Sequence, residues 1–138
     1  MSADRDDLVF VRHILEAISK IQRYTEGMSW ETFSIDEKTQ DAVVRQFEVI
    51  GEAAKKVSEA FRNQHPNVPW SQMARMRDVL IHHYFGVDLS VVWETVQRDI
   101  PTLLSVFRCW WRGPRRVPGA IPRAALRTVM QLGGNTTR

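Results

Sequence analysis

The sequence predicts an all-α fold, in which four helices, or at most five, form an antiparallel bundle. Apolar residues recur at the helical spacings of three and four in four successive segments, and no segment alternates with period two for long enough to be a strand. Amphipathic helices joined by short polar connections bury their apolar faces most economically against one another. The 138 residues are enough for one hydrophobic core.

The first helix is expected over residues 5–26. Asp4, Asp6 and Asp7 favour its N-terminus, which is the positive end of the helix dipole. Gly27 is expected to end it. The apolar face of this helix is formed by Leu8, Val11, Leu15 and Ile18.

The second helix is expected to open with a capping box, in which Ser34 is the N-cap and Glu37 lies three residues later. It should run unbroken to about Arg62, because Pro66 and Pro69 cannot continue a helix. Its apolar face consists of Val43, Phe47, Ile50, Ala54, Val57 and Phe61.

The third helix should start at Trp70 or Ser71 and run toward Gly86. Asp88 is then the expected N-cap of a fourth helix, which Pro101 kinks or restarts. The apolar stripe of this fourth helix contains Leu89, Val92, Trp93, Val96, Ile100, Leu103 and Phe107.

Charge divides the chain after Phe107. Residues 1–107 carry 12 basic and 16 acidic residues, a net charge of −4, whereas residues 108–138 carry seven arginines and no acidic residue, a net charge of +7. We therefore expect a helical domain over residues 1–107 and a basic, Arg/Pro/Gly-rich extension over residues 108–138. Within the extension, residues 122–132 are the candidate for one short helix.

Composition excludes two classes of protein. One cysteine cannot form an internal disulfide, and no apolar run reaches the length of about 18 residues that a membrane span needs. Aspartates precede the first apolar run, which argues against a signal peptide. The expected location is the cytoplasm, without membrane contact.

Ionisable residues of catalytic type crowd into the segment ARMRDVLIHHYFG at residues 74–86. On an ideal helix of about 100° per residue, Arg77 lies within about 60° of apolar neighbours, so it belongs to the apolar stripe. These neighbours are Trp70, Met73, Leu80, Ile81 and Tyr84. An arginine facing a core is costly unless it is paired or lines a cleft. The simplest structural explanation is an ion pair with a glutamate of the second helix, either Glu48, Glu52 or Glu59.

Asp78 and His82 lie four residues apart, so the carboxylate can orient the imidazole on one helix face. Most such helical pairs are surface contacts. Arg77 and His82 are about 140° apart on an ideal helix and cannot converge from one regular helix. Either the helix loosens before His82, or these side chains meet groups from another copy of the protein.

Other chemistry-bearing patterns are weak. The histidines and the single cysteine have no zinc-like spacing, and neither a Gly-rich phosphate loop nor a nucleophile elbow is present, so no metal or cofactor is expected. Gly51 costs about 1 kcal/mol within a helix, and with Ala53 and Ala54 it makes a smooth patch for close helix approach. Trp70 and Trp93 are expected in the core.

Arg77, His82 and Tyr84 reproduce an Arg-x4-His-x-Tyr motif, and the sequence resembles the HepT-like toxins of the HEPN superfamily over about residues 6–107. The surrounding segments agree with that family in order and spacing. They are VIGEAAKKVS at 49–58, the Pro-x-x-Pro-Trp run at 66–70, HHYFGVD at 82–88 and VWETVQRDIPTL at 92–103.

The resemblance implies a HEPN-type bundle and a metal-independent ribonuclease toxin, which acts on RNA through a cleft shared by a homodimer. It also implies a site in which His82 is the general acid or base, Arg77 holds the scissile phosphate and Asp78 orients His82. The implied partner is a minimal nucleotidyltransferase antitoxin, which neutralises the toxin by transferring AMP to Tyr84.

Two departures from the family pattern leave alternatives open. His83 replaces an acidic or polar residue, and residues beyond about Phe107 have no counterpart in the family. The extension is an RNA-binding arm, a disordered segment or a reading-frame extension. The alternative function for the whole chain is a non-catalytic helical module that binds a nucleotide or docks to a nucleotidyltransferase.

Overall fold

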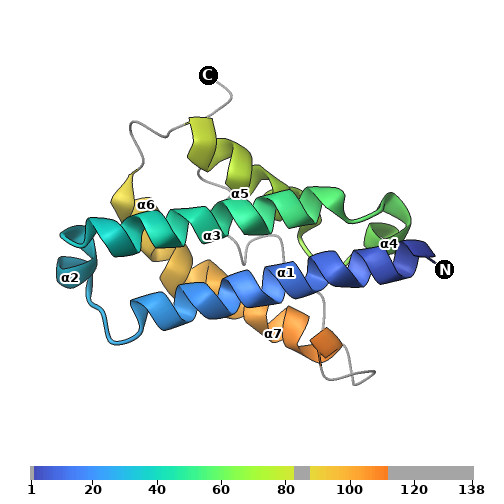
Figure 1. Cartoon of the computed structure of the whole chain (residues 1–138), viewed down its shortest axis with the longest axis horizontal. Helices are drawn as coiled ribbons and strands as arrows, with labels where there is room; N and C mark the ends of the chain where they lie inside the picture. The colour runs from blue at the N-terminus through green and yellow to red at the C-terminus, as the bar shows by residue number, and fades with distance from the viewer. Residues whose placement is uncertain (1, 83–87, 112–138) are drawn as a thin grey trace.

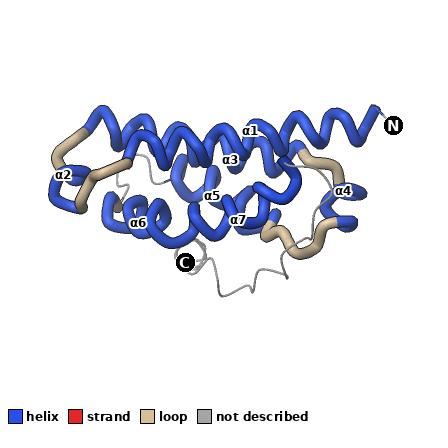
Figure 2. The backbone as a smooth tube through the Cα atoms, turned by 90° about the horizontal axis from the view of Figure 1, so that it is seen from below, coloured by secondary structure: helices blue, strands red, loops and turns tan. Residues whose placement is uncertain are grey.

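The computed structural model of the chain describes residues 2–82 and 88–111, and every regular element in these ranges is a helix (Figure 2). The elements are α1 (Ser2–Thr25), α2 (Trp30–Ser34), α3 (Glu37–Lys56), α4 (Glu59–Gln64), α5 (Trp70–His82), α6 (Leu89–Glu94), the π-helical η2 (Thr95–Asp99) and α7 (Ile100–Trp111). The predicted all-α bundle is confirmed, and its long members are α1, α3, α5 and the continuous α6–η2–α7 segment.

The helices form two layers. α1 and α3 lie side by side and antiparallel in one layer, and α5 and the α6–η2–α7 segment lie in the other (Figures 1 and 2). α3 packs against both α1 and α5, and α1 also contacts α7. The short helices α2 and α4 lie at opposite ends of the bundle (Figure 1). The two layers are therefore joined by α3, which packs against α5, and by the contact of α1 with α7.

One hydrophobic core lies between the layers, and most of the predicted apolar positions contribute to it. Its largest fully buried side chains are Phe33, Phe47, Phe107, Ile14, Ile18, Ile21, Ile50, Met73, Met76, Ile100 and Leu103. Each such side chain contributes about 1.5–3 kcal/mol when it leaves water. None of the described helices combines the length and apolar character that crossing a bilayer requires.

Gly27 follows the end of α1, as predicted. Its φ of 73° lies in the left-handed region, which glycine adopts without the steric cost of a Cβ atom. The backbone N–H of Met28 donates to the carbonyl of Thr25 at 3.0 Å, which closes the turn beyond the helix. The glycine therefore stops α1 and directs the chain toward α2.

The predicted capping box at Ser34 and Glu37 is wrong. Ser34 is the last residue of α2, and the N-cap of α3 is Asp36. The carboxylate of Asp36 accepts hydrogen bonds from the backbone N–H and the hydroxyl of Thr39 at 3.1 and 2.7 Å, and these bonds lower the pKa of Asp36. An aspartate satisfies the orphan N–H groups of a helix start as well as a serine does.

The predicted unbroken helix to Arg62 is also wrong, because α3 ends at Lys56. Val57 has an extended conformation with ψ 134°, and Ser58 becomes the N-cap of α4. The N–H and hydroxyl of Ser58 donate to the two carboxylate oxygens of Asp7 at 2.8 and 2.7 Å. This contact with a buried aspartate on α1 holds the corner that separates α3 from α4.

Asp88 is the N-cap of α6, as predicted. It accepts hydrogen bonds from the N–H and hydroxyl of Ser90 at 3.0 and 2.6 Å, and the hydroxyl bond is the main cause of its lowered pKa. Further along, the N–H of Ile100 donates to the carbonyl of Thr95, a π-helical bond across five residues. The π-helical η2 and the start of α7 meet next to Pro101. Proline has no backbone N–H, so it would interrupt the hydrogen-bond ladder of a regular α-helix.

α7 continues past Phe107 to Trp111. The ring of Trp110 lies against Trp70 and Phe107, with centroid distances of 6.1 and 5.4 Å. The division of the chain at residues 107 and 108 stays a prediction. The short helix predicted at residues 122–132 lies outside the described residues.

Candidate active site

α3 and α5 approach each other closely at Gly51 and Arg77. A Cβ atom placed on Gly51 would lie 2.3 Å from Cβ, 2.8 Å from N and 3.0 Å from Cα of Arg77. No carbon atom tolerates such distances, so only glycine permits this contact. The predicted role of Gly51 in close helix packing is confirmed, and the contact places α3 against the base of the Arg77 side chain.

Arg77 forms one of the predicted ion pairs with a glutamate of the second helix. Its Nε donates to Oε2 of Glu52 at 2.8 Å. The side chains of Arg77 and Glu52 are 36% and 46% exposed, so this arginine of the apolar stripe is paired, as the costly position requires, and stays partly in contact with water. The Cβ atom packs against α3, while the long stem carries the guanidinium to the rim of the bundle.

Arg77 lines an open cleft of about 400 Å³ between α1, α3 and α5. We call this the Arg77 cleft. Its lining residues are Phe10 and His13 from α1, Arg45, Glu48, Val49, Glu52, Ala53 and Lys56 from α3, and Arg77 from α5. A cleft of this volume admits part of a nucleotide.

The charges that line the Arg77 cleft are arranged in pairs along α3. Arg45 pairs with Glu48 at 3.3 Å, and Nζ of Lys56 lies 3.9 Å from Oε1 of Glu52, whose other oxygen accepts from Arg77. The cleft lining thus carries one more cation than carboxylate. This balance is opposite in sign to that of residues 1–107 as a whole, and it favours an anionic ligand.

Sequence reasoning missed His13, Arg45 and Lys56 as residues of the cleft. A signal exists on α3, because positions 45, 48, 52 and 56 recur at helical spacing and so share one face. His13 comes from α1, and only the packing of α1 against α3 brings it to that face.

The other predicted site residues are placed only by their backbone or lie outside the described residues. Asp78 and His82 belong to α5, and His82 is its last residue. The side chains of both residues, and Tyr84 as a whole, lie outside the described part of the structure. The contacts among Arg77, Asp78 and His82 therefore stay a prediction.

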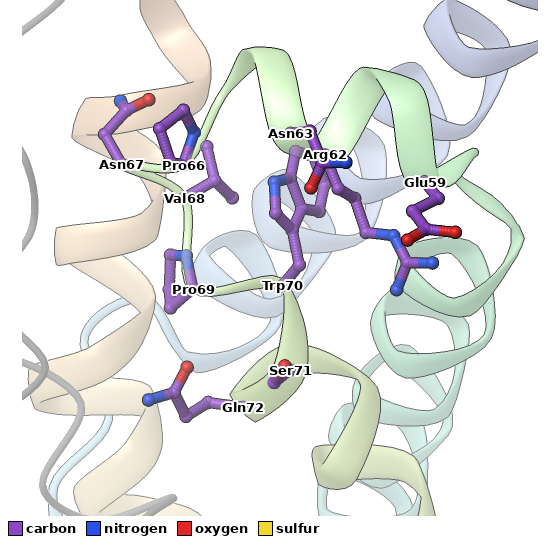
Figure 3. A pocket seen from close by; sticks show the side chains of 10 residues that line it. All are labelled: Glu59, Arg62, Asn63, Pro66, Asn67, Val68, Pro69, Trp70, Ser71 and Gln72. Carbon is purple, nitrogen blue, oxygen red and sulfur yellow. The ribbon is translucent and has the colours of Figure 1, made fainter.

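A second pocket, of about 640 Å³, lies between α4 and the start of α5 (Figure 3). Its lining includes Arg62, the amides Asn63, Asn67 and Gln72, and Trp70. The indole N–H of Trp70 donates to a carbonyl in the connection before α5, and only 6% of the residue is exposed. Trp70 is therefore a core residue, as predicted, and not a platform for stacking a base.

Trp93 and His65 are also held by aromatic neighbours. The ring of Trp93 lies 5.1 Å from that of Phe33, and His65 lies 4.5 Å from both Phe61 and Trp110. Burial lowers the pKa of His65. Within residues 2–82 and 88–111, no group of three His, Cys, Asp or Glu side chains is placed to hold a metal ion.

The fold and the cleft define a small all-α protein in which an ion-paired arginine lines a cleft with a net positive lining. Comparison with protein families agrees with the motif, since the model described as "Ribonuclease HepT-like" matches residues 14–109. The chain belongs to the HepT-like ribonuclease family.

Similar proteins support this membership. A probable ribonuclease HepT of Thermococcus cleftensis is 50% identical over 98 residues, which cover 71% of this chain and 89% of that protein. A candidate RNase of Methanocaldococcus jannaschii is 46% identical over 97 residues, covering 70% and 80%. A third relative, from the same organism, is named as a gamma-glutamylcyclotransferase and candidate RNase. It is 44% identical over 99 residues, which cover 72% of this chain and 45% of that protein. No solved structure matches the chain.

Proposed function

We propose that this chain is a ribonuclease toxin that cleaves RNA, either tRNA or mRNA, in the cytoplasm without a metal ion. The observation that carries the proposal is the position of Arg77 in a member of a ribonuclease family: its partly exposed side chain lines an open cleft with a net positive lining. A guanidinium is a permanent cation whose planar fork matches a phosphate. RNA presents such a phosphate at each link of its backbone.

In the proposed reaction His82 removes the proton from a ribose 2′-hydroxyl. The 2′-oxygen then attacks the adjacent phosphorus, and the bond to the 5′-oxygen of the next nucleotide breaks, so that a cyclic phosphate forms and the leaving oxygen takes up a proton. Arg77 stabilises the negative charge that develops on the phosphate oxygens. Asp78 orients the imidazole of His82.

A second copy of the chain would complete this site. α5 continues as a helix through His82, and on a regular helix Arg77 and His82 point about 140° apart. In a homodimer the arginine of one copy can meet the histidine of the other, which one regular helix does not allow within a single copy. We therefore propose that the active form is a homodimer.

The test is cleavage of tRNA and mRNA by the purified protein in the presence of a metal chelator. We expect wild-type cleavage, its loss in His82→Ala and its loss in a folded Arg77→Ala. Equal cleavage by wild type and His82→Ala would reject the role of His82. No cleavage by either protein favours the non-catalytic binding module, and failure of Arg77→Ala to fold supports a purely structural ion pair.

We also propose that a minimal nucleotidyltransferase acts as antitoxin and transfers AMP to Tyr84, as the family resemblance implies. The tyrosine lies two positions after His82, so an attached adenylate adds negative charge beside the phosphate-binding groups and repels RNA. Intact-mass measurement and peptide mapping after co-expression should place AMP on Tyr84. The sequence contains one other tyrosine, Tyr24, and Tyr24→Phe is the matched control for Tyr84→Phe. Modification that persists in Tyr84→Phe contradicts the assignment.

A further inference from the structure

Glu52 is an acidic side chain in direct contact with Arg77. We propose that Glu52 is a positioning residue, which sets the direction of the Arg77 guanidinium in the Arg77 cleft; this inference rests on the proposed ribonuclease function. It concerns a residue that does not belong to the Arg-x4-His-x-Tyr motif and lies on a different helix.

The geometry around Glu52 supports this role from two sides. The adjacent Gly51 brings the backbone of α3 against N, Cα and Cβ of Arg77, so the root of the arginine side chain is fixed relative to α3. Glu52 is the next residue of α3, and its Oε2 accepts a hydrogen bond from Nε of Arg77 at 2.8 Å. The side chain of Arg77 is therefore held at its root and again at the start of its guanidinium.

A contact at Nε is well suited to orientation. The Nε–H bond lies in the plane of the guanidinium, so a fixed Nε–H direction together with the Cδ–Nε bond sets that plane and the side to which the terminal nitrogens point. The other oxygen of Glu52 lies 3.9 Å from Nζ of Lys56, so the carboxylate faces a second cation. One carboxylate between two cations leaves the group positively charged and attractive to phosphate.

The exposure of the pair argues against a mainly stabilising role. Both side chains are more than a third exposed, and ion pairs of that kind contribute little to the stability of a fold because water screens them. An unrestrained arginine, in contrast, occupies many rotamers and meets a phosphate in a productive geometry only part of the time. Orientation is therefore the larger effect that Glu52 can exert.

The experiment compares single-turnover and steady-state RNA cleavage by the full-length wild type, Glu52→Ala and Glu52→Gln. Glu16 on α1 is an exposed helical glutamate that does not line the Arg77 cleft, and Glu16→Ala controls for the loss of one carboxylate. We expect Glu52→Ala to lower kcat by about 2- to 5-fold at nearly unchanged KM, because an exposed ion pair shifts rotamer populations by a factor of this order. Glu52→Gln should retain more kcat than Glu52→Ala, because its amide oxygen still accepts from Nε.

Each outcome bears on the proposal. A kcat for Glu52→Ala equal to or above that of the wild type overturns it, and an increase means that Glu52 competes with the RNA phosphate. Equal losses in Glu52→Ala and Glu52→Gln, or failure of Glu52→Ala to fold, also overturn it. If the wild type does not cleave RNA, the proposed function itself fails, which distinguishes that result from a failure of Glu52 alone.

Discussion

Replacing Gly51 by alanine tests a close contact between α3 and α5 beside the candidate site. The added Cβ would lie 2.3 Å from Cβ and 2.8 Å from N of Arg77. Both atoms belong to the root of a helical residue, so no side-chain rotation can relieve the clash. The two helices must move apart until the carbons reach an ordinary separation of about 3.5–4.0 Å, a displacement of roughly 1 Å or more.

Two opposing terms set the change in stability. Overpacking of this kind costs about 1–3 kcal/mol, whereas alanine is favoured over glycine within a helix by about 1 kcal/mol. We expect Gly51→Ala to lower the free energy of unfolding by about 1 kcal/mol, and by at most about 2. The unfolding temperature should fall by about 4 °C for each kcal/mol in a protein of this size.

The assay combines urea unfolding, thermal unfolding and RNA cleavage. Displacement of the Arg77 backbone by about 1 Å should lower kcat by as much as 100-fold, more than the loss of stability alone explains. A Gly51→Ala protein that is stabilised by about 1 kcal/mol and fully active would refute the reasoning. That result would mean that helix propensity decides the sign and that α3 and α5 do not need this close approach.

Three further changes test other contacts. Asp7→Ala removes the buried acceptor for the N–H and hydroxyl of Ser58 and should cost about 1–3 kcal/mol in urea unfolding, whereas an unchanged midpoint would mean that the α3–α4 corner holds without it. Asp88→Ala removes the N-cap of α6 and should cost about 0.5–2 kcal/mol, most of which Asp88→Ser restores. Burial lowers the pKa of His65, so the folded state binds its proton more weakly than the unfolded chain; this destabilisation is absent well above about pH 6.5 and grows as the pH falls below it. The unfolding temperature should therefore fall less between about pH 7.5 and about pH 5.5 in His65→Gln than in the wild type, and equal slopes would contradict this.

Features that depend on a few neighbouring residues were predictable from the sequence. The end of α1 at Gly27 and the cap of α6 at Asp88 each follow from residues within one turn. The end of α3 was not predictable in this way, because the apolar pattern continues through Val57 to Phe61. The residue that holds Ser58 in its cap is Asp7, 51 positions earlier in the chain.

The candidate site was predictable only in part, because it too depends on contacts between distant residues. Three glutamates were possible partners of Arg77, and the close approach at Gly51 brings the next residue, Glu52, within reach. Arg45 and Lys56 line the cleft because α1 and α5 flank the same face of α3. The charge pattern on α3 identifies a polar face, whereas the partners of that face depend on contacts between distant parts of the chain.

The hydrogen bonds between Asp7 and Ser58 also bear on the order of events during folding. They close a loop of 51 residues, whereas the helical ladders of α1 and α3 join residues four apart. Closing a long loop costs chain entropy before its contacts repay that cost. We therefore expect the first turns of α1 to dock late, after α3 has formed. A change near Asp7 that prevents this docking should loosen the corner between α3 and α4.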